Sequence, residues 1–408
     1  MRVVALADSD SYVKWGAALL GTLGPEWERI LLVVESQFVV NDEQLRAALG
    51  GTGIDDGERV GLRAVAARVA ELRPDAVLVA APGPVTMVLV RLVAELNPRP
   101  VIVTGMPGIS IPVTTKALRF RRQSDLMIVH SRREVREFTA RAEERGWDVR
   151  LGLARLPFAI TRPAHGDDLV FAAQAVVPRE YAERLEVARM LRDAALADPS
   201  RRVVVKLRAR PGERSTHPER DAFPELLATL GPRPANLVDV AGPMSDALDT
   251  AGGFVTVSST ALLEALARGI PALTIDTFGV ADHLINPVFT GSGLFGGRDD
   301  VIARRVRHPD PAWLDDNYFH DPATGDWTRD LAELVAARRT GSLAPRSARI
   351  PAGGALRAAW DRKMAFGPSD RSATGYLALG VGTPLRATVR LGRRLRSRLR
   401  RPATEDAA

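Results

Sequence analysis

The sequence predicts an α/β protein made of two Rossmann-like parallel-sheet domains. Short apolar strands alternate with helices through residues 1–155, a stretch with Pro157 and Pro163 interrupts the series, and the alternation resumes over 164–345. Strands joined by helical crossovers pair in parallel and are covered by helices on both faces. Right-handed crossovers make each sheet Rossmann-like. At 408 residues the chain is long enough for two such domains.

In the first domain, runs of Val, Ile, Leu and Ala predict buried strands, and apolar residues at helical spacing, such as Val65 and Val69, predict the helices. The expected strands are Arg2–Ala7, Ile30–Val34, Ala76–Ala81, Pro100–Thr104 and Leu126–His130. The expected helices are Tyr12–Leu23, Leu62–Leu72, Val85–Leu96 and Arg132–Glu144. The glycine fingerprint of dinucleotide-binding folds does not follow the first strand, so no NAD site is expected.

The second domain is expected to repeat this pattern. Leu151–Pro163 is expected to be a linker, with the domain boundary at 156–163. The expected strands are Leu169–Ala175, Arg202–Arg208, Leu237–Val240, Phe254–Val257 and Ile270–Ile275. The expected helices are Arg179–Ala197, Ala261–Arg268 and Asp326–Arg338. Residues 346–408 are expected to form a C-terminal extension.

Three hydroxyl residues, Ser258, Ser259 and Thr260, stand between the strand Phe254–Val257 and the helix Ala261–Arg268. At the start of a helix, free backbone N–H groups and the positive end of the dipole point outward, and hydroxyls add donors, so the turn can hold a phosphate. Parallel α/β sheets bind ligands at the carboxyl ends of their strands, where this turn lies. The alternative is an ordinary Ser/Thr helix cap.

Two Rossmann-like halves with a phosphate turn in the second describe the GT-B architecture, in which a nucleotide donor on the second domain faces an acceptor domain across a cleft. The chain resembles a family of predicted glycosyltransferases from actinobacteria over most of residues 1–340. The matching segments are ALADSDSYVKW, TGMPGISIP, VVVKLRARPGERSTH, VSSTALLEALARGIP and WLDDNYFH. It is similar, more distantly, to bacterial sialyl- and polysialyltransferases and to the CDP-glycerol glycerophosphotransferases of the cell wall.

The resemblance implies how the nucleotide is held. The distant relatives hold the nucleotide phosphate with a His-Pro motif and a Ser-Ser/Thr motif, which His217-Pro218 and Ser258-Ser259 match in order and in domain. The resemblance also implies a hexosyl or sialyl type of transfer, from a nucleotide sugar to an envelope glycan or lipid-linked acceptor in polysaccharide biosynthesis. A GT-B enzyme of this kind needs no metal ion and no resident cofactor, because the nucleotide sugar is a co-substrate.

Transfer from a nucleotide sugar builds negative charge on the leaving phosphate, which needs donors. Lys206, Arg208 and Arg210 alternate from the end of a strand, so their side chains share one face and are candidates for neutralising that charge. A solvated edge strand is the alternative. His217 is a candidate donor to the phosphate or acid for the leaving group, unless it is a packed loop histidine. Glu264 is a candidate for binding ribose hydroxyls or a plain surface residue.

The acceptor hydroxyl needs a base. Asp8 and Asp10 flank the carboxyl end of the first strand, and Asp10 is preferred because it lies further out on the loop. Asp10 or Ser11 could instead cap the following helix. His130, at the end of a later strand, is the runner-up base. A flexible acceptor loop is expected at Gly105, Met106, Pro107 and Gly108. No His or carboxylate spacing typical of a metal site is present.

The net charge of +7 is concentrated at the C-terminus, because residues 386–401 contain eight Arg and no acid, and 386–408 carry +6. Leu391, Leu395 and Leu399 share one stripe of a helix, which predicts a basic amphipathic segment on an anionic membrane. A disordered tail without a partner is the alternative. Nucleic acid is not expected, because 386–401 has no aromatic residue for base stacking. The absence of cysteine and of a signal peptide favours the cytoplasm, at the inner face of the membrane.

Three functions remain open at this point. A glycosyltransferase is favoured. A UDP-sugar 2-epimerase of the same fold would keep the phosphate turn but would need neither an acceptor nor a membrane tail. A non-enzymatic polyanion-binding protein ranks last, because the body of the chain outside the tail is nearly neutral.

Overall fold

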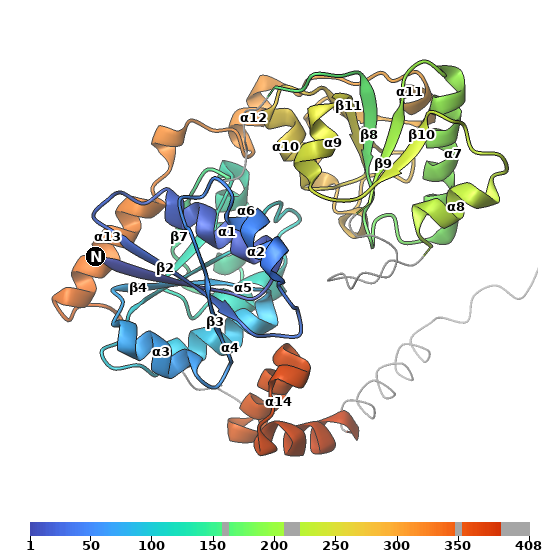
Figure 1. Ribbon diagram of the computed structural model, residues 1–408. Helices are drawn as coiled ribbons and strands as arrows, with labels where there is room; N and C mark the ends of the chain where they lie inside the picture. The colour runs from blue at the N-terminus through green and yellow to red at the C-terminus, as the bar shows by residue number, and fades with distance from the viewer. Residues whose placement is uncertain (157–162, 208–220, 347–352, 385–408) are drawn as a thin grey trace, which may run out of the picture. The chain divides into compact units, whose positions relative to one another are not determined.

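The computed structural model describes residues 1–156, 163–207, 221–346 and 353–384. Strands and helices alternate along these residues and form two parallel sheets (Figure 1). The α/β class with two parallel-sheet domains, predicted from the sequence, is confirmed. The Arg-rich segment 386–401 lies outside the described residues.

Within the described residues the first sheet has seven strands, in the order β3-β2-β1-β4-β5-β6-β7. They are β1 (Arg2–Ala7), β2 (Glu28–Val34), β3 (Glu58–Val60), β4 (Ala76–Ala80), β5 (Val101–Gly105), β6 (Leu126–Val129) and β7 (Leu151–Leu153). The order reverses between β1 and β4, because the chain first adds β2 and β3 on one side of β1 and then adds β4 on the other. Open α/β sheets bind ligands at such a switch point, at the carboxyl ends of the strands.

The helices between these strands bury apolar faces against the sheet. They are α1 (Asp10–Gly21), α2 (Asp42–Leu49), α3 (Val65–Leu72), α4 (Gly83–Ala94), α5 (Thr115–Arg121) and α6 (Arg132–Glu143). Val65 and Val69 are fully buried, as their spacing predicted, and so is Trp15 of α1. In Figure 1, α1 lies on one face of the sheet and α3 and α4 on the other. The strands between them are therefore apolar on both faces.

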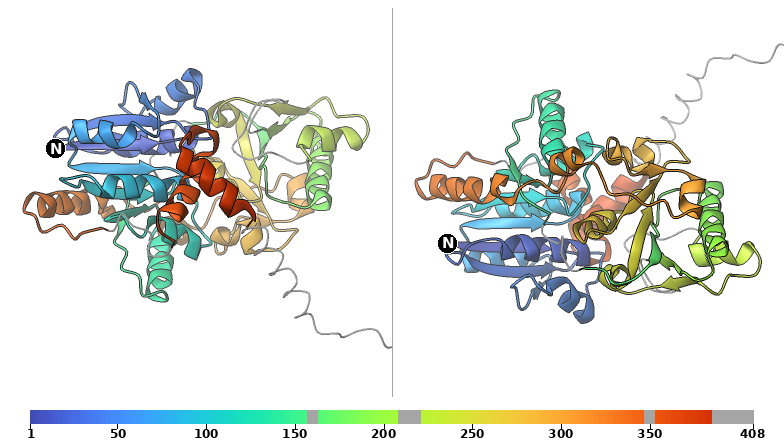
Figure 2. Two further views of the ribbon diagram at one scale, coloured as in Figure 1. Left: turned by 90° about the horizontal axis from the view of Figure 1, so that it is seen from below. Right: turned by 90° about the horizontal axis from the view of Figure 1, so that it is seen from above.

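Within the described residues the second sheet has six strands, in the order β10-β9-β8-β11-β12-β13. They are β8 (Asp168–Ala172), β9 (Val203–Lys206), β10 (Leu237–Val240), β11 (Ala251–Thr256), β12 (Ala272–Ile275) and β13 (Phe295–Gly296). The helices are α7 (Tyr181–Ala197), α8 (Phe223–Thr229), α9 (Met244–Asp249), α10 (Ala261–Ala267) and α11 (Arg298–Ile302). The views in Figure 2 show α7 on one face and α9 and α10 on the other. This sheet has its switch point between β8 and β11.

After the second sheet the chain returns to elements of the first. It forms α12 (Pro311–Asp316), α13 (Trp327–Arg339) and α14 (Gly354–Phe366), with 3-10 turns at Asp282–Leu284, Pro287–Phe289, Pro322–Thr324 and Gly367–Ser369, and a last helix at 373–384. Arg338 Nε donates to Arg99 O, 2.9 Å away. Arg91 of α4 pairs with Asp361 of α14 at 3.4 Å, and Phe366 is buried in the core of the first sheet.

By its contacts the chain divides into two compact units. One comprises Met1–Thr104, Arg119–Asp125 and Ala332–Ala408, and the other Gly105–Leu118 and Leu126–Leu331. Leu151–Leu153, expected to open the linker, instead forms β7 and pairs with β6. A strand of three residues is too short to show a hydrophobic pattern in the sequence, so β7 was not predicted. The domain boundaries at 156–163 and at 346 stay predictions.

Candidate active site

Neutral polar groups surround the switch point of the second sheet. Gln174 follows β8, and its Oε1 accepts a hydrogen bond from the Ser258 N–H at 2.9 Å, while its Nε2 donates to Ser258 Oγ at 3.2 Å. Thr256 Oγ1, at the end of β11, accepts from the Ser259 N–H at 3.0 Å. These bonds fix the turn between β11 and α10 at the carboxyl end of β8. The switch point expected to bind a ligand and the hydroxyl triplet therefore coincide.

The three hydroxyls of the triplet have different surroundings. Ser258 is buried against Gln174. Ser259 Oγ accepts from the Ala261 N–H at 3.2 Å, which is a local capping bond of the ordinary kind. Thr260 is half-buried and makes no side-chain capping bond to α10. Because α10 has only seven residues, its dipole is small, and a ligand would depend on the hydroxyls. Ser258 and Ser259 only accept in these bonds, and Thr260 caps nothing, so all three keep an O–H to donate.

The predicted acceptor loop reaches this turn within the same compact unit. Gly108 has φ 130°, and a Cβ placed on it would lie 2.8 Å from Thr260 Cγ2 and 3.1 Å from Thr260 Oγ1. A side chain at this position would clash with Thr260 and would also strain the backbone. The structure thus brings one residue of the predicted acceptor loop to one residue of the predicted phosphate turn.

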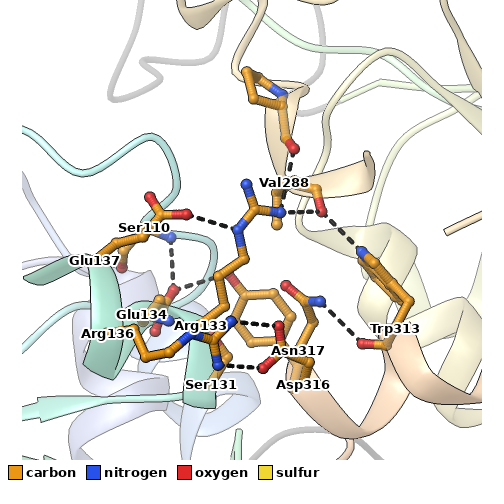
Figure 3. Close-up of polar contacts among 12 residues, drawn as sticks. Ser110, Ser131, Arg133, Glu134, Arg136, Glu137, Val288, Trp313, Asp316 and Asn317 are labelled. Carbon is orange, nitrogen blue, oxygen red and sulfur yellow. Dashed lines mark hydrogen bonds and ion pairs between the residues drawn. The ribbon is translucent and has the colours of Figure 1, made fainter. Parts of the chain in front are cut away.

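A buried carboxylate anchors the same loop. Glu134 of α6 is fully buried, and its Oε1 accepts from the Ser110 N–H at 2.9 Å and from the Tyr318 hydroxyl at 2.8 Å (Figure 3). Its Oε2 accepts from the His130 N–H at 2.7 Å. Burial raises the pKa of Glu134, and these donors oppose that rise. Glu134 therefore joins the loop, the end of β6 and the segment after α12 at one point.

Arginines on the same helix fix its orientation. Arg133 Nη1 donates to Pro287 O at 3.3 Å and to Val288 O at 3.2 Å (Figure 3). Arg136 forms two hydrogen bonds with the Asp316 carboxylate, at 2.6 and 2.8 Å. The Arg136–Asp316 pair is largely exposed, so its net stabilisation is at most about 1 kcal/mol. Its value lies in the bidentate geometry, which holds α6, and Glu134 with it, in one orientation.

His130, the runner-up base, is fully buried. Its Nδ1 lies 2.9 Å from Ala154 O, and burial lowers its pKa to about 4, so that the ring is neutral at pH 7. In the segment after α12, Tyr318 has φ 29°. In the described part of the chain, Asn317 Oδ1 and His320 Nε2 are buried without a hydrogen-bond partner. Such strain and unsatisfied polar atoms are concentrated at functional sites in proteins.

The switch point of the first sheet holds a buried carboxyl. Asp8 follows β1 and is 1% exposed, and neither of its carboxylate oxygens has a hydrogen-bond partner of normal geometry among the described residues. Burial raises the pKa of Asp8 to about 7, against smaller lowering effects from the Ser36 and Ser9 hydroxyls. Asp10, the preferred base of the sequence analysis, is exposed and is the first residue of α1. The N-cap is Ser9 and not Asp10.

The buried Arg121 also lies at this switch point. Its Nη2 donates to Ala81 O, just after β4, at 3.3 Å. Burial lowers the pKa of Arg121, and its interaction with the Tyr12 phenol opposes this. Burial raises the pKa of Tyr12, and the charge of Asp8 adds to that rise. Asp8, Tyr12 and Arg121 therefore form one electrostatically linked group.

The other predicted donor-site residues are placed less favourably or are not described. Lys206, at the end of β9, is 4% exposed, and its Nζ donates to Leu207 O at 2.6 Å. Glu264 is half-buried on α10. Arg208, Arg210 and His217 lie outside the described residues. Across the ranges that the structure describes, no group of three or more His, Cys, Asp or Glu could hold a metal ion.

A family model described as "Putative glycosyltransferase (DUF6716)" matches residues 3–334. The chain belongs to this family. The match includes both switch points and the segment 313–320. No curated protein matches the sequence.

Solved structures share the fold of this glycosyltransferase-family protein at low sequence identity. A "putative UDP-N-acetylglucosamine 2-epimerase" from Listeria monocytogenes has a TM-score of 0.54 at 13% identity, covering 85% of this chain and 98% of that one. An S. aureus MnaA–UDP co-structure has a TM-score of 0.53 at 11% identity, covering 86% and 99%. At such identities the likeness shows the fold alone, which is GT-B-like with two parallel-sheet α/β domains.

Sequence reasoning missed Gln174, Glu134 and Tyr318. Gln174 is the only polar residue between Leu169 and Pro178, and a lone polar residue just after an apolar strand is a usable signal. Ser131 and Glu134 have the spacing of a capping box, but the Glu134 carboxylate bonds to the loop instead. Tyr318 lies in the WLDDNYFH segment, whose residues carry the family resemblance but no recognisable chemical motif.

Proposed function

We propose that this protein is a glycosyltransferase that moves a sugar from a nucleotide-activated donor to an envelope glycan or lipid-linked acceptor. Membership of the family supports the reaction class. The observation that carries the donor site is the turn after β11, where Gln174 fixes Ser258 and leaves the Thr260 hydroxyl unused in capping, at the switch point of the sheet.

The donor phosphates bind at this turn. Thr260 Oγ1 and the backbone N–H groups of the turn donate to them, and Ser258 and Ser259 keep the turn in shape. Positive charge for the leaving phosphate comes from Arg208, Arg210 and His217, with Lys206 as a further candidate, and Glu264 binds the ribose. Hydroxyl, N–H and guanidinium donors stabilise the negative charge that develops on the leaving phosphate, so the proposal includes no metal ion.

The acceptor hydroxyl loses its proton to Asp8. A general base works best when its pKa lies near the working pH, and the pKa of Asp8 is raised to about 7. The acceptor oxygen then bonds to the anomeric carbon of the sugar as the bond from that carbon to the phosphate oxygen breaks. Asp10 remains the alternative base, because it is exposed at the same strand end. Gly105–Gly108 supplies the acceptor loop.

The enzyme works at the inner face of the cytoplasmic membrane, held there by the eight Arg of 386–401. Each basic residue near an anionic surface contributes about 1 kcal/mol, so this segment suffices even after a large discount. Among the helices of the described ranges, none combines the length and the apolar character that crossing a bilayer requires.

A UDP-sugar 2-epimerase reaction is the second candidate. The structures named above as a UDP-N-acetylglucosamine 2-epimerase and as MnaA with UDP share this fold, and a fold does not decide between the two reactions. A polyanion-binding role ranks third, because the charge is confined to the tail.

A panel of CMP-, UDP-, GDP- and CDP-activated sugars distinguishes the three functions. A glycosyltransferase releases nucleotide at a rate that rises when acceptor is added. An epimerase interconverts a UDP-sugar without releasing UDP and without an acceptor. If no donor binds or reacts, while anionic polymers bind, the enzymatic proposal is wrong.

A further inference from the structure

Residues 354–384 of the C-terminal extension form a helical hairpin. A Cβ placed on Gly382 would lie 2.1 Å from Cε3 of Trp360, so the helix 373–384 packs closely on α14. Lys363 Nζ lies 3.7 Å from the centroid of the Tyr376 ring. Trp360 thus lies beside Gly382, and Lys363, later in α14, lies beside Tyr376, earlier in the last helix. The two helices are therefore antiparallel.

The hairpin exposes large apolar side chains. Tyr376, Leu377 and Val381 of the last helix are 55%, 63% and 43% exposed, and Leu356 and Met364 of α14 are 46% and 42% exposed. Leu377 and Val381 are one turn apart and share a side of their helix. We call Tyr376, Leu377 and Val381, which lie close together on the last helix, the hairpin patch. Single exposed apolar residues are common on proteins, but a concentration of them in one short segment marks an interaction surface.

The patch is not the side by which the hairpin attaches to the protein. Ala365 and Phe366 of α14 are buried in the core of the first sheet, and Asp361 pairs with Arg91 of α4. Ala378 of the last helix is 1% exposed. Each helix therefore already has a buried side, and the patch remains available to a partner.

The sequence that follows indicates the partner. The described helix ends at 384, and the segment with eight Arg and no acid begins at residue 386. A partner that meets both must offer apolar material to the hairpin and negative charge to the adjoining tail. An anionic lipid leaflet offers both, in the acyl boundary and in the headgroups. A second copy of this chain would instead bring another Arg-rich tail, which repels the first.

We propose that the hairpin of α14 and residues 373–384 is a membrane-docking element, whose patch inserts at the headgroup boundary of an anionic leaflet while the Arg-rich tail binds the headgroups. The inference rests on the proposed membrane association and adds an apolar component to it. Charge attraction alone is screened by salt, whereas apolar insertion is not. If the tail and the patch both bind the membrane, binding decreases as the salt concentration rises, but a part of it persists at high salt.

Cosedimentation of the full chain with vesicles of phosphatidylserine and phosphatidylcholine tests this. Leu377→Ser with Val381→Ser is expected to lower partition onto these vesicles about ten-fold and to abolish the part that survives high salt. Val39→Ser is the matched control, because Val39 is 79% exposed and lies outside the hairpin. Thermal unfolding of both variants should match the wild type, because the replaced side chains are exposed.

Partition of the double variant equal to that of wild type, at low and at high salt, overturns the docking role of the patch. A change in oligomeric state by light scattering, with unchanged vesicle binding, also overturns it and assigns the patch to a second copy. Replacing the eight tail Arg by Gln tests the tail separately. If the wild-type chain itself fails to bind anionic vesicles, the proposed membrane association fails as a whole.

Discussion

The switch points of the two sheets hold different kinds of polar group. At the first, Asp8 is buried, neither of its carboxylate oxygens has a hydrogen-bond partner of normal geometry among the described residues, and its pKa is raised to about 7. At the second, Gln174, Thr256 and Ser258 are neutral and bonded to the turn after β11. A buried acid without partners destabilises the fold but titrates near neutral pH, whereas a satisfied neutral network holds a fixed shape at any pH. One strand end is thus suited to exchanging a proton and the other to holding an anion.

The largest effect is expected at the first switch point. Asp8→Asn should lower turnover by about 10²–10⁴-fold, because asparagine cannot take up the acceptor proton. Donor affinity should change little. Asp10→Asn is the matched control, since it removes an exposed carboxylate two residues away. A loss that follows Asp10 instead would make the exposed residue the base. Unchanged turnover in both variants would leave His130 as the next candidate.

The same substitution is expected to stabilise the fold above neutral pH. The pKa of Asp8 rises from 3.8 in the unfolded chain to about 7 in the folded protein, so the folded state holds this proton more tightly. The stabilisation of the fold by the protonated Asp8 carboxyl is fully present below pH 4 and is lost as the pH rises to about 7. Asparagine has no proton to lose at this position, so the variant keeps its stability over this range. The shift corresponds to about 4 kcal/mol.

Denaturant unfolding of wild type and Asp8→Asn from pH 4 to pH 8 measures this. The free energy of unfolding of the variant should exceed that of wild type by a margin that grows up to about pH 7 and then stays constant. A margin that does not vary with pH would mean that Asp8 is ionised in the folded protein throughout, and the comparison between the two switch points would lose its basis.

The second switch point should respond in stability without dependence on pH. Ser258→Ala removes the acceptor of Gln174 Nε2, and because Gln174 is only half-buried the cost is about 0.5–1.5 kcal/mol in the free energy of unfolding. In the double variant Gln174→Ala/Ser258→Ala the two losses should not add, because both remove one network. Additive losses in this double-mutant cycle, measured by denaturant unfolding, would show that the two side chains act independently.

Much of this arrangement was predictable and some was not. Continuous apolar runs predicted the central strands, and a triple hydroxyl after one strand and two carboxylates after another marked two strand ends. That both strand ends lie at switch points follows only from the observed strand order. The edge strands β3, β7 and β13 have too few residues to show a pattern. The roles of Gln174 and Glu134 depend on partners 84 and 184 positions away, at Ser258 and Tyr318, and only folding brings such pairs together.

An effect on stability is also expected at Glu134. Glutamine has one acceptor oxygen, so Glu134→Gln places an amide donor against one of the N–H groups that the carboxylate accepts, at a cost of about 1–3 kcal/mol. Glu137→Gln is the control, because Glu137 makes a partly exposed pair with Arg133, worth about 0.2–1 kcal/mol. Equal losses in the two variants by denaturant unfolding would show that Glu134 does not hold the loop.

The division between the two switch points is tested most directly by calorimetric titration of wild type, Thr260→Val and Asp8→Asn with the nucleotide that the reactive donor releases. Valine keeps the shape of threonine and removes only the hydroxyl. A lost hydrogen bond to a charged phosphate costs about 1.5–3 kcal/mol, so nucleotide affinity should fall about 10- to 150-fold in Thr260→Val. Affinity should stay near wild type in Asp8→Asn. Unchanged affinity in Thr260→Val, with a loss in Asp8→Asn, would contradict the account by placing the donor at the first sheet.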